Sequence, residues 1–227
     1  MKNFLLSIAL FSLFSFKSFG HVDHYANFNY LEYELFRNNK SIGYHKYDFI
    51  RGGDKLSIIS EVSFKINKLG VDLYSYFAKS NEDYEKGIFK SYSSKTKQNK
   101  KHRFVNINYN EEEGDLIIDG SSYKGKADKE FIVGTWWNHE IVKAKAQISG
   151  ISGRIIEQTV TFIGKEEITI GDKTYKTLHF NFKSSDETLP ESKKLNTDIW
   201  YEEGTYLWVK AAFDKTGYWE YRIKKVK

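Results

Sequence analysis

The stretch Gly134-Thr135-Trp136-Trp137-Asn138-His139 decides how the rest of the chain is interpreted. Strand-like sequence precedes it and follows it, whereas the residues from Trp137 to Ile148 break the alternation of apolar and polar side chains. We therefore expect a short helical or irregular crossover that joins two antiparallel meanders. Each buried tryptophan covers roughly 150–250 Å². The adjacent tryptophans are expected to plug or line the space between the two halves.

On both sides of this stretch, the sequence has the pattern of antiparallel strands joined by tight turns. Apolar and polar residues alternate most clearly from Leu56 to Ile66, and a period of two places one set on one face. Turn signals such as Gly52-Gly53-Asp54 separate consecutive strands. We interpret Gly125 to Glu130 as a polar loop. The pattern predicts an all-β, mainly antiparallel fold, a curved sheet or incomplete β-barrel of roughly eleven strands with the central crossover as its plug.

The first residues have the pattern of a secretory signal peptide. Lys2 precedes an apolar run from Phe4 to Phe16, and Ser18-Phe19-Gly20 supplies small residues for cleavage. We expect residues 1–20 to be removed near Gly20, residues 21–227 to form a single β-barrel-like domain, and the protein to reside in the periplasm or outside the cell. A retained N-terminal anchor is the alternative. The chain has no cysteine, which excludes disulfides and the lipid-modified lipoproteins.

The charge of the chain is mildly basic. The 227 residues carry a formal net charge of +5, and loss of Lys2 and Lys17 with the signal peptide leaves +3. We interpret the basic group at Lys95, Lys97, Lys100, Lys101 and Arg103 as a solvated hairpin. We therefore expect no nucleic-acid partner. A peripheral contact with the envelope membrane or its proteins stays open, as does the oligomeric state.

Several short motifs occur in a characteristic order along the mature chain. They are Tyr33-Glu34, Ile42-Gly43-Tyr44-His45, Lys68-Leu69-Gly70-Val71, Tyr74-Ser75-Tyr76, Glu85-Lys86-Gly87, Trp137-Asn138, Ile199-Trp200-Tyr201 and Glu220-Tyr221-Arg222. In this order and spacing, the chain resembles a family of secreted Gram-negative proteins that is known only as a domain of unknown function. More distantly, it resembles the incomplete β-barrels of periplasmic lipoprotein carriers. That resemblance implies an apolar hollow under a lid, and it supplies no catalytic residues.

The motifs that could carry chemistry each have a plainer interpretation. His45 and His139 could orient a polar ligand group. We favour the interpretation that each is hydrogen-bonded to backbone at a turn, because no partner residue has the spacing of a catalytic triad or a metal site. After cleavage, the new N-terminal segment His21-Val22-Asp23-His24 could bind copper, but the sequence fixes no distant partner histidine. The run Glu111-Glu112-Glu113-Gly114-Asp115 lacks the ligand spacing of a calcium loop. We therefore expect no metal and no cofactor.

Aromatic side chains are the remaining functional signal, at 17% of residues. Cross-strand packing accounts for most of them, and a subset is expected to line the hollow. Our first hypothesis is a non-enzymatic exported protein that binds a lipid or another apolar ligand in this hollow. The alternatives are an envelope enzyme acting on a glycan or a lipid head group, and a structural component of envelope assembly. The expected ligand-site residues are Trp136, Trp137, Asn138, His139, His45, Tyr74, Tyr76, Trp200 and Trp208.

Overall fold

The structure is a computed structural model that describes residues 25–227. The predicted signal peptide and the proposed copper ligands His21 and His24 lie outside the described residues. The question of a retained anchor concerns the same undescribed segment.

Fifteen strands form one sheet. The first eight are β1 (Tyr30–Arg37), β2 (Lys40–Gly52), β3 (Lys55–Lys68), β4 (Val71–Glu85), β5 (Ile88–Gln98), β6 (Lys101–Asn110), β7 (Asp115–Gly120) and β8 (Lys124–Asp128). The others are β9 (Ile132–Val133), β10 (Ala146–Ile148), β11 (Ile155–Ile170), β12 (Lys173–Ser184), β13 (Asn196–Glu202), β14 (Trp208–Asp214) and β15 (Tyr218–Val226). Two short 3-10 helices, η2 (His139–Val142) and η3 (Glu191–Lys193), lie between strands.

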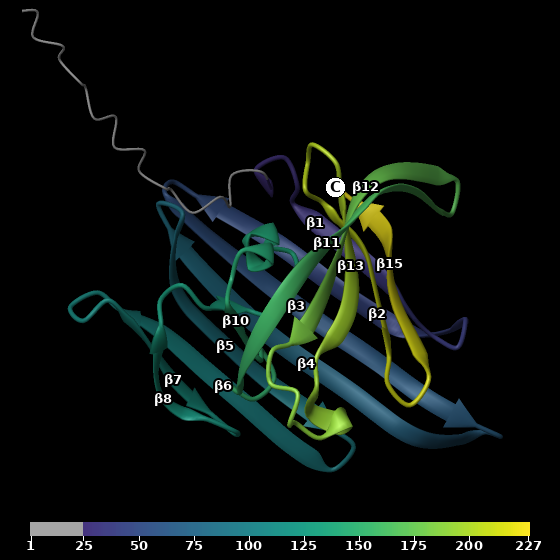
Figure 1. Cartoon of the computed structure of the whole chain (residues 1–227), viewed down its shortest axis with the longest axis horizontal. Helices are drawn as coiled ribbons and strands as arrows, with labels where there is room; N and C mark the ends of the chain where they lie inside the picture. Colours follow the sequence, from purple (N-terminus) through teal and green to yellow (C-terminus); the bar gives the residue numbers. More distant parts are fainter. Residues whose placement is uncertain (1–24) are drawn as a thin grey trace, which may run out of the picture.

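The sheet has two arms that meet at β1, which pairs with both β2 and β15. One arm runs from β2 to β8, and the other runs from β15 back to β9. All neighbouring strands are antiparallel except β9 and β10. Residues 129–131 connect the two free edges, β8 and β9, so the arms curve toward each other (Figure 1). The predicted all-β, curved and unclosed sheet is confirmed.

Two details of the prediction were wrong. The sheet has fifteen strands rather than roughly eleven, partly because β9 and β10 are strands of two and three residues within the central stretch. The segment Gly125 to Glu130 was interpreted as a loop, yet its first residues belong to β8, which pairs with β7 from Asp115↔Asp128 to Asp119↔Lys124. Charged side chains suit such an edge strand because they discourage pairing with another chain, so their polarity disguised it.

The inner face of the first arm has small side chains across its middle. The cross-strand register aligns Ser60 with Ser80 and Ser80 with Ser94. This row leaves room for the loop at residues 149–153, where the Ser94 hydroxyl donates to the Gly150 carbonyl oxygen at 2.5 Å. At Gly120, a Cβ atom would lie only 2.5 Å from the Ser152 carbonyl oxygen. The loop at residues 149–153 can therefore lie against the sheet only because the residues that face it, the serines and Gly120, have small side chains or none.

The aromatic core lies where the two arms face each other. Trp208 stacks on Tyr33 with ring centroids 4.0 Å apart, and both side chains are fully buried. A smaller cluster under β5 to β8 includes Val105, Ile107 and Ile118. Aromatic packing of this kind adds stability beyond the area buried. The core thus fixes the positions of the arms, and the central stretch lies between them.

Candidate functional site

The central stretch makes an abrupt turn at Trp136. The Trp137 N–H donates to the Thr135 carbonyl oxygen at 2.8 Å, and Trp136 between them has φ +61°. This is a three-residue γ-turn with a left-handed central residue, a rare and strained conformation. A non-glycine residue held in this way costs roughly 1–3 kcal/mol. The surrounding structure must therefore hold the turn in place.

Two buried tyrosines from opposite arms hold this turn. The Tyr47 hydroxyl on β2 donates to the Thr135 carbonyl oxygen at 2.6 Å. The Tyr201 hydroxyl on β13 donates to the Trp136 carbonyl oxygen at 2.9 Å. Because the turn reverses the side-chain directions, Trp137 enters the core with 0% exposure while Trp136 stays half-buried. The sequence-based expectation that Trp137 is the more buried of the two is confirmed.

Trp136 lies in the wall of a cavity of about 260 Å³ between the central stretch and the inner face of β2 to β5. The sheet side contributes rings and small hydroxyl-bearing residues: His45, Tyr47, Ser60, Tyr76, Ser80, Tyr92 and Ser94. The other side includes Trp136, Gln147, Ser149, Ile156 and Tyr221. Ala78, in the middle of β4, also lines it. The row of small side chains thus produces a hollow with an aromatic and hydroxyl-rich wall.

Two polar atoms in this wall are buried and have no hydrogen-bond partner among the described residues: His45 Nδ1 and Trp136 Nε1. The other ring nitrogen of His45 lies 2.8 Å from the Ser60 hydroxyl. Burial lowers the pKa of His45 from 6.5 to about 3, because desolvation disfavours the charged imidazolium. The histidine is therefore neutral at physiological pH. His45 Nδ1 and the Trp136 indole N–H therefore have unused hydrogen-bonding capacity beside the cavity.

A buried carboxylate lies directly behind the turn. Glu82 on β4 is 2% exposed and accepts hydrogen bonds from Trp137 Nε1 at 2.9 Å and from the Tyr84 hydroxyl at 2.6 Å. The Thr135 hydroxyl is 3.4 Å away. Burial raises the pKa of Glu82 to about 7, although these hydrogen bonds favour the ionised form. Glu82 therefore links β4 to the central stretch through donors on both sides.

The sequence-based site did not include Glu82, although a signal was present. Inward-facing residues on β4 include Tyr76, Ala78 and Tyr84, and Glu82 has the same parity. A charged residue at an inward position of an alternating strand needs a partner in the interior. That position alone could have marked Glu82 as a candidate.

A second cavity, of about 470 Å³, lies on the other side of the central stretch. It is bordered by the ends of β4 to β7 and by residues 129–133. Asn138 and Glu140 face it, and the Asn138 amide lies 3.5 Å from the Tyr84 hydroxyl. The Tyr84 hydroxyl thus connects Glu82 to this second cavity.

Of the nine expected ligand-site residues, the structure brings His45, Tyr76 and Trp136 together in the first cavity. Asn138 lines the second cavity, and Trp137 is in the core. Trp208 does not line the first cavity but packs against Trp136, with their ring centroids 5.5 Å apart. The other expected residues lie elsewhere.

Three of these residues pack against partners away from the first cavity. His139 stacks on Tyr206 at 4.3 Å and lies 3.2 Å from the Glu140 carboxylate. Trp200 stacks on His179 at 4.2 Å and donates to Glu166 at 2.6 Å. Tyr74 packs beside Phe64, with ring centroids 5.9 Å apart. Period-two alternation could not show which side of the sheet each aromatic faces, because several strands carry large side chains on both faces.

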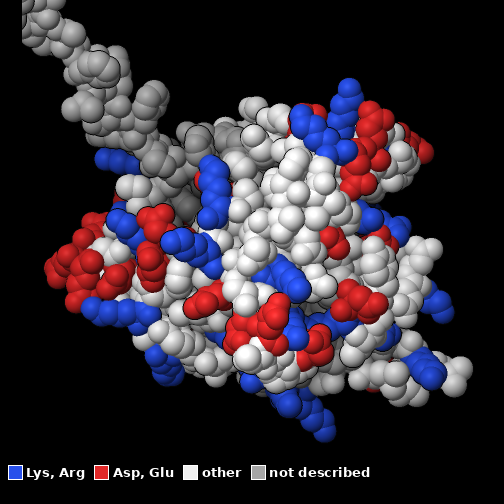
Figure 2. Space-filling view, viewed as in Figure 1, with Lys and Arg blue, Asp and Glu red and all other residues white. Residues whose placement is uncertain are grey.

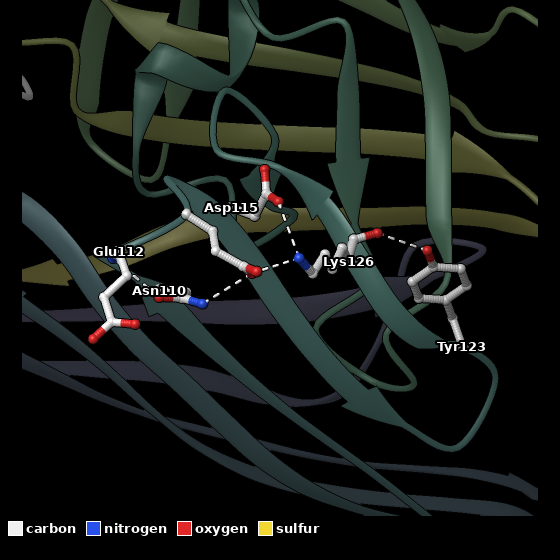
Figure 3. A network of polar contacts seen from close by, with 6 residues as sticks. Asn110, Glu112, Asp115, Tyr123 and Lys126 are labelled. Carbon is white, nitrogen blue, oxygen red and sulfur yellow. Dashed lines mark hydrogen bonds and ion pairs between the residues drawn. The ribbon is translucent and has the colours of Figure 1, made fainter.

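The acidic run between β6 and β7 forms a turn whose carboxylates pair with a neighbouring strand. Lys126 on β8 contacts Glu113 and lies 3.8 Å from Asp115 (Figure 3). Asn110 also bonds to Glu113, at 3.1 Å. Across residues 25–227, no group of three or more His, Cys, Asp or Glu side chains is arranged to hold a metal ion. No helix in that range is long and apolar enough to cross a membrane.

Comparison with known proteins shows similarity at the level of family and fold. The crystal structure of a β-barrel-like protein of the domain of unknown function DUF1849 from Brucella abortus aligns with a TM-score of 0.58 and 9% identity, over 87% of this chain and 96% of that one. A DUF1329 family protein from Desulfovibrio piger aligns with a TM-score of 0.26 and 9% identity, over 90% of this chain and 88% of that one. No curated protein matches the chain. The family model "Domain of unknown function (DUF6134)" matches residues 33–224, so the chain belongs to the DUF6134 family.

Proposed function

We propose that the protein binds a small amphipathic organic molecule in the cavity beside Trp136. The observation that carries this proposal is the pair of buried, unpartnered polar atoms, His45 Nδ1 and Trp136 Nε1, in one aromatic wall. An unsatisfied buried donor or acceptor costs about 1–3 kcal/mol. A ligand group that bonds to these atoms recovers this energy, while its apolar part packs on Tyr76 and Tyr221.

The wall restricts the chemistry of this ligand. The Trp136 indole is a donor only, so it suits a carbonyl, ether or hydroxyl oxygen. His45 is neutral and provides no counter-charge, which favours an uncharged polar group over an anion. A cavity of about 260 Å³ is slightly below the usual range of ligand pockets, roughly 300–1,000 Å³. A ring or a short acyl chain with one polar group fits better than a whole diacyl lipid. We place this binding in the periplasm or outside the cell, on the strength of the predicted signal peptide.

Filling the cavity tests the proposal without removing a polar group. Ala78→Leu adds three carbon atoms at the middle of the wall, and we expect it to lower the affinity for 2-naphthol and for a medium-chain monoacylglycerol at least tenfold. The free energy of unfolding should change by less than about 1.5 kcal/mol, because the added atoms enter open space. Calorimetric titration and chemical denaturation measure the two quantities.

The matched control is Ser93→Leu, which adds a similar side chain to an exposed position of the neighbouring strand β5. It should bind both probes as the wild-type protein does. Failure of the wild type to bind either probe, or equal binding by Ala78→Leu, would contradict the proposal.

One observation favours the second candidate function, an envelope enzyme acting on a lipid head group or a glycan. The His45 imidazole and the Ser60 hydroxyl, 2.8 Å apart, have the geometry of a base and a nucleophile. The depressed pKa of His45 opposes this role, because a base with a pKa of about 3 accepts a proton poorly. If the enzyme hypothesis holds, an activated ester should leave an acyl group on the wild type in intact-mass measurements and none on Ser60→Ala. We expect no Ser60-dependent adduct.

A further inference from the structure

The turn between β3 and β4 has an unusual residue at its tip. Leu69 and Gly70 both have left-handed backbones, with φ +52° and +80°. The left-handed conformation is unfavourable for a leucine, whereas glycine and asparagine adopt it readily. In other hairpin turns of the described chain, the corresponding left-handed positions carry Asn38, Lys86 and Asn99. Leu69 nevertheless points its side chain into solvent and is 94% exposed.

The apolar character continues along the start of β4. Val71 is 61% exposed and Leu73 is 55% exposed. Leu73 lies at an irregularity in the pairing of β3 with β4, between the partners Asn67↔Asp72 and Ile66↔Tyr74. This end of β3 and β4 extends at the lower right of Figure 1. Folding leaves these three side chains exposed, so they contribute nothing to the core.

A basic hairpin flanks this apolar tip. The turn between β5 and β6 is joined to β4 because the Asn99 N–H donates to the Ser75 carbonyl oxygen at 2.8 Å, and the Ser75 N–H donates to Asn99 Oδ1 at 2.7 Å. Positive side chains surround this turn, namely Lys97, Lys100, Lys101 and Arg103, and none of them has an acidic partner within residues 25–227. The residues interpreted from sequence as a solvated hairpin thus form the rim of an exposed apolar tip.

The turns at the two ends of the first arm differ in charge. Antiparallel pairing puts the β3–β4 and β5–β6 turns at one end of the arm and the β6–β7 turn at the other. The β6–β7 turn carries the acidic run from Glu111 to Asp115. In Figure 2, acidic side chains gather at the left of the molecule and basic ones project from its lower edge. A negatively charged surface would therefore attract the end that carries Leu69.

We infer that this end of the first arm docks on an anionic lipid surface. Leu69, Val71 and Leu73 would enter the boundary between head groups and acyl chains, and the lysines would approach the lipid phosphates. Each lysine or arginine near such a surface contributes about 1 kcal/mol, or roughly fivefold in binding. A nucleic acid would also bind the basic side chains, but it offers no apolar phase in which Leu69, Val71 and Leu73 could be buried. The inference is independent of the proposed ligand, although β4 leads from this tip to Tyr76 in the cavity wall.

Co-sedimentation of the protein with lipid vesicles tests this inference. We expect binding to vesicles of phosphatidylcholine with one third phosphatidylglycerol, weakened by salt, and no binding to pure phosphatidylcholine. Leu69→Asn should weaken binding at least fivefold. This variant should fold at least as well as the wild type, because asparagine suits the left-handed position. Lys100→Glu with Lys101→Glu should weaken binding by well over tenfold.

The control is Lys55→Glu with Lys86→Glu, which makes the same charge change at the opposite end of the strands. It should retain more affinity for vesicles than the Lys100 and Lys101 variant, even though the net charge is equal. Equal loss in both variants, or Leu69→Asn binding like the wild type, would overturn the inference. Stronger binding to a single-stranded oligonucleotide than to the vesicles, unaffected by Leu69→Asn, would assign the surface to nucleic acid instead.

Discussion

Replacement of Trp137 by alanine should lower the free energy of unfolding by about 3–5 kcal/mol, the usual cost of removing a large aromatic side chain from a core. Trp137 is fully buried, and its ring meets those of Tyr25, Phe49 and Tyr84 at centroid distances of 5.5–5.8 Å. Its indole N–H also donates to the buried Glu82. The substitution therefore leaves a cavity and removes a hydrogen bond at once. Chemical denaturation measures the loss.

The neighbouring tryptophan provides the comparison. Trp136 is only half-buried and its indole nitrogen has no partner in the described chain, so Trp136→Ala should cost clearly less. It should, however, weaken binding of the probes that test the proposed cavity. Equal and mild losses of stability in both variants would show that the central stretch does not organise the fold.

The buried carboxylate predicts a specific dependence of stability on pH. Folding raises the pKa of Glu82 from 4.5 to about 7, so between these values the folded chain holds a proton that the unfolded chain releases. The contribution of this group to stability is therefore lost as the pH rises from about 4.5 to about 7. Since each pKa unit corresponds to about 1.36 kcal/mol, this shift corresponds to about 3 kcal/mol in the free energy of unfolding.

The variant Glu82→Gln isolates this effect. Buried His45 acts in the opposite direction, because folding lowers its pKa from 6.5 to about 3. Its contribution to stability therefore rises as the pH increases from about 3 to 6.5. The wild type alone would thus show a partial cancellation. The difference in the free energy of unfolding between the wild type and Glu82→Gln should fall by about 3 kcal/mol, to the disadvantage of the wild type, between pH 4.5 and 8. A constant difference across this range would show that Glu82 titrates normally.

The sequence predicted the strands and the importance of the central stretch because both depend on local patterns. Alternation from Leu56 to Ile66 and the glycine-containing turns indicated antiparallel hairpins, and the break after Trp137 indicated the crossover. The cavity could not be predicted in the same way. It depends on Ser60, Ser80 and Ser94 lying opposite one another, which is a matter of register between strands.

The orientation of Trp136 was also beyond local patterns. Tryptophan has no preference for a left-handed backbone, and this turn exists because Tyr47 and Tyr201, from distant strands, hold its carbonyl groups. The expected site therefore included Trp136 for its aromatic character and not for its geometry. By contrast, Glu82 could have been recognised, because its inward position on β4 follows directly from the alternation.

The pairing of β1 with β15 has a consequence for the order in which the chain folds. The other strand pairs connect segments close in sequence, whereas this one brings Leu31 beside Val226. Closing a loop of this length costs roughly 5 kcal/mol in chain entropy, and such distant contacts form slowly. We therefore expect the hairpins of each arm to form early and the two arms to pair last, through β1 and β15. During synthesis, the aromatic interior stays open to water until the nine residues of β15 have emerged.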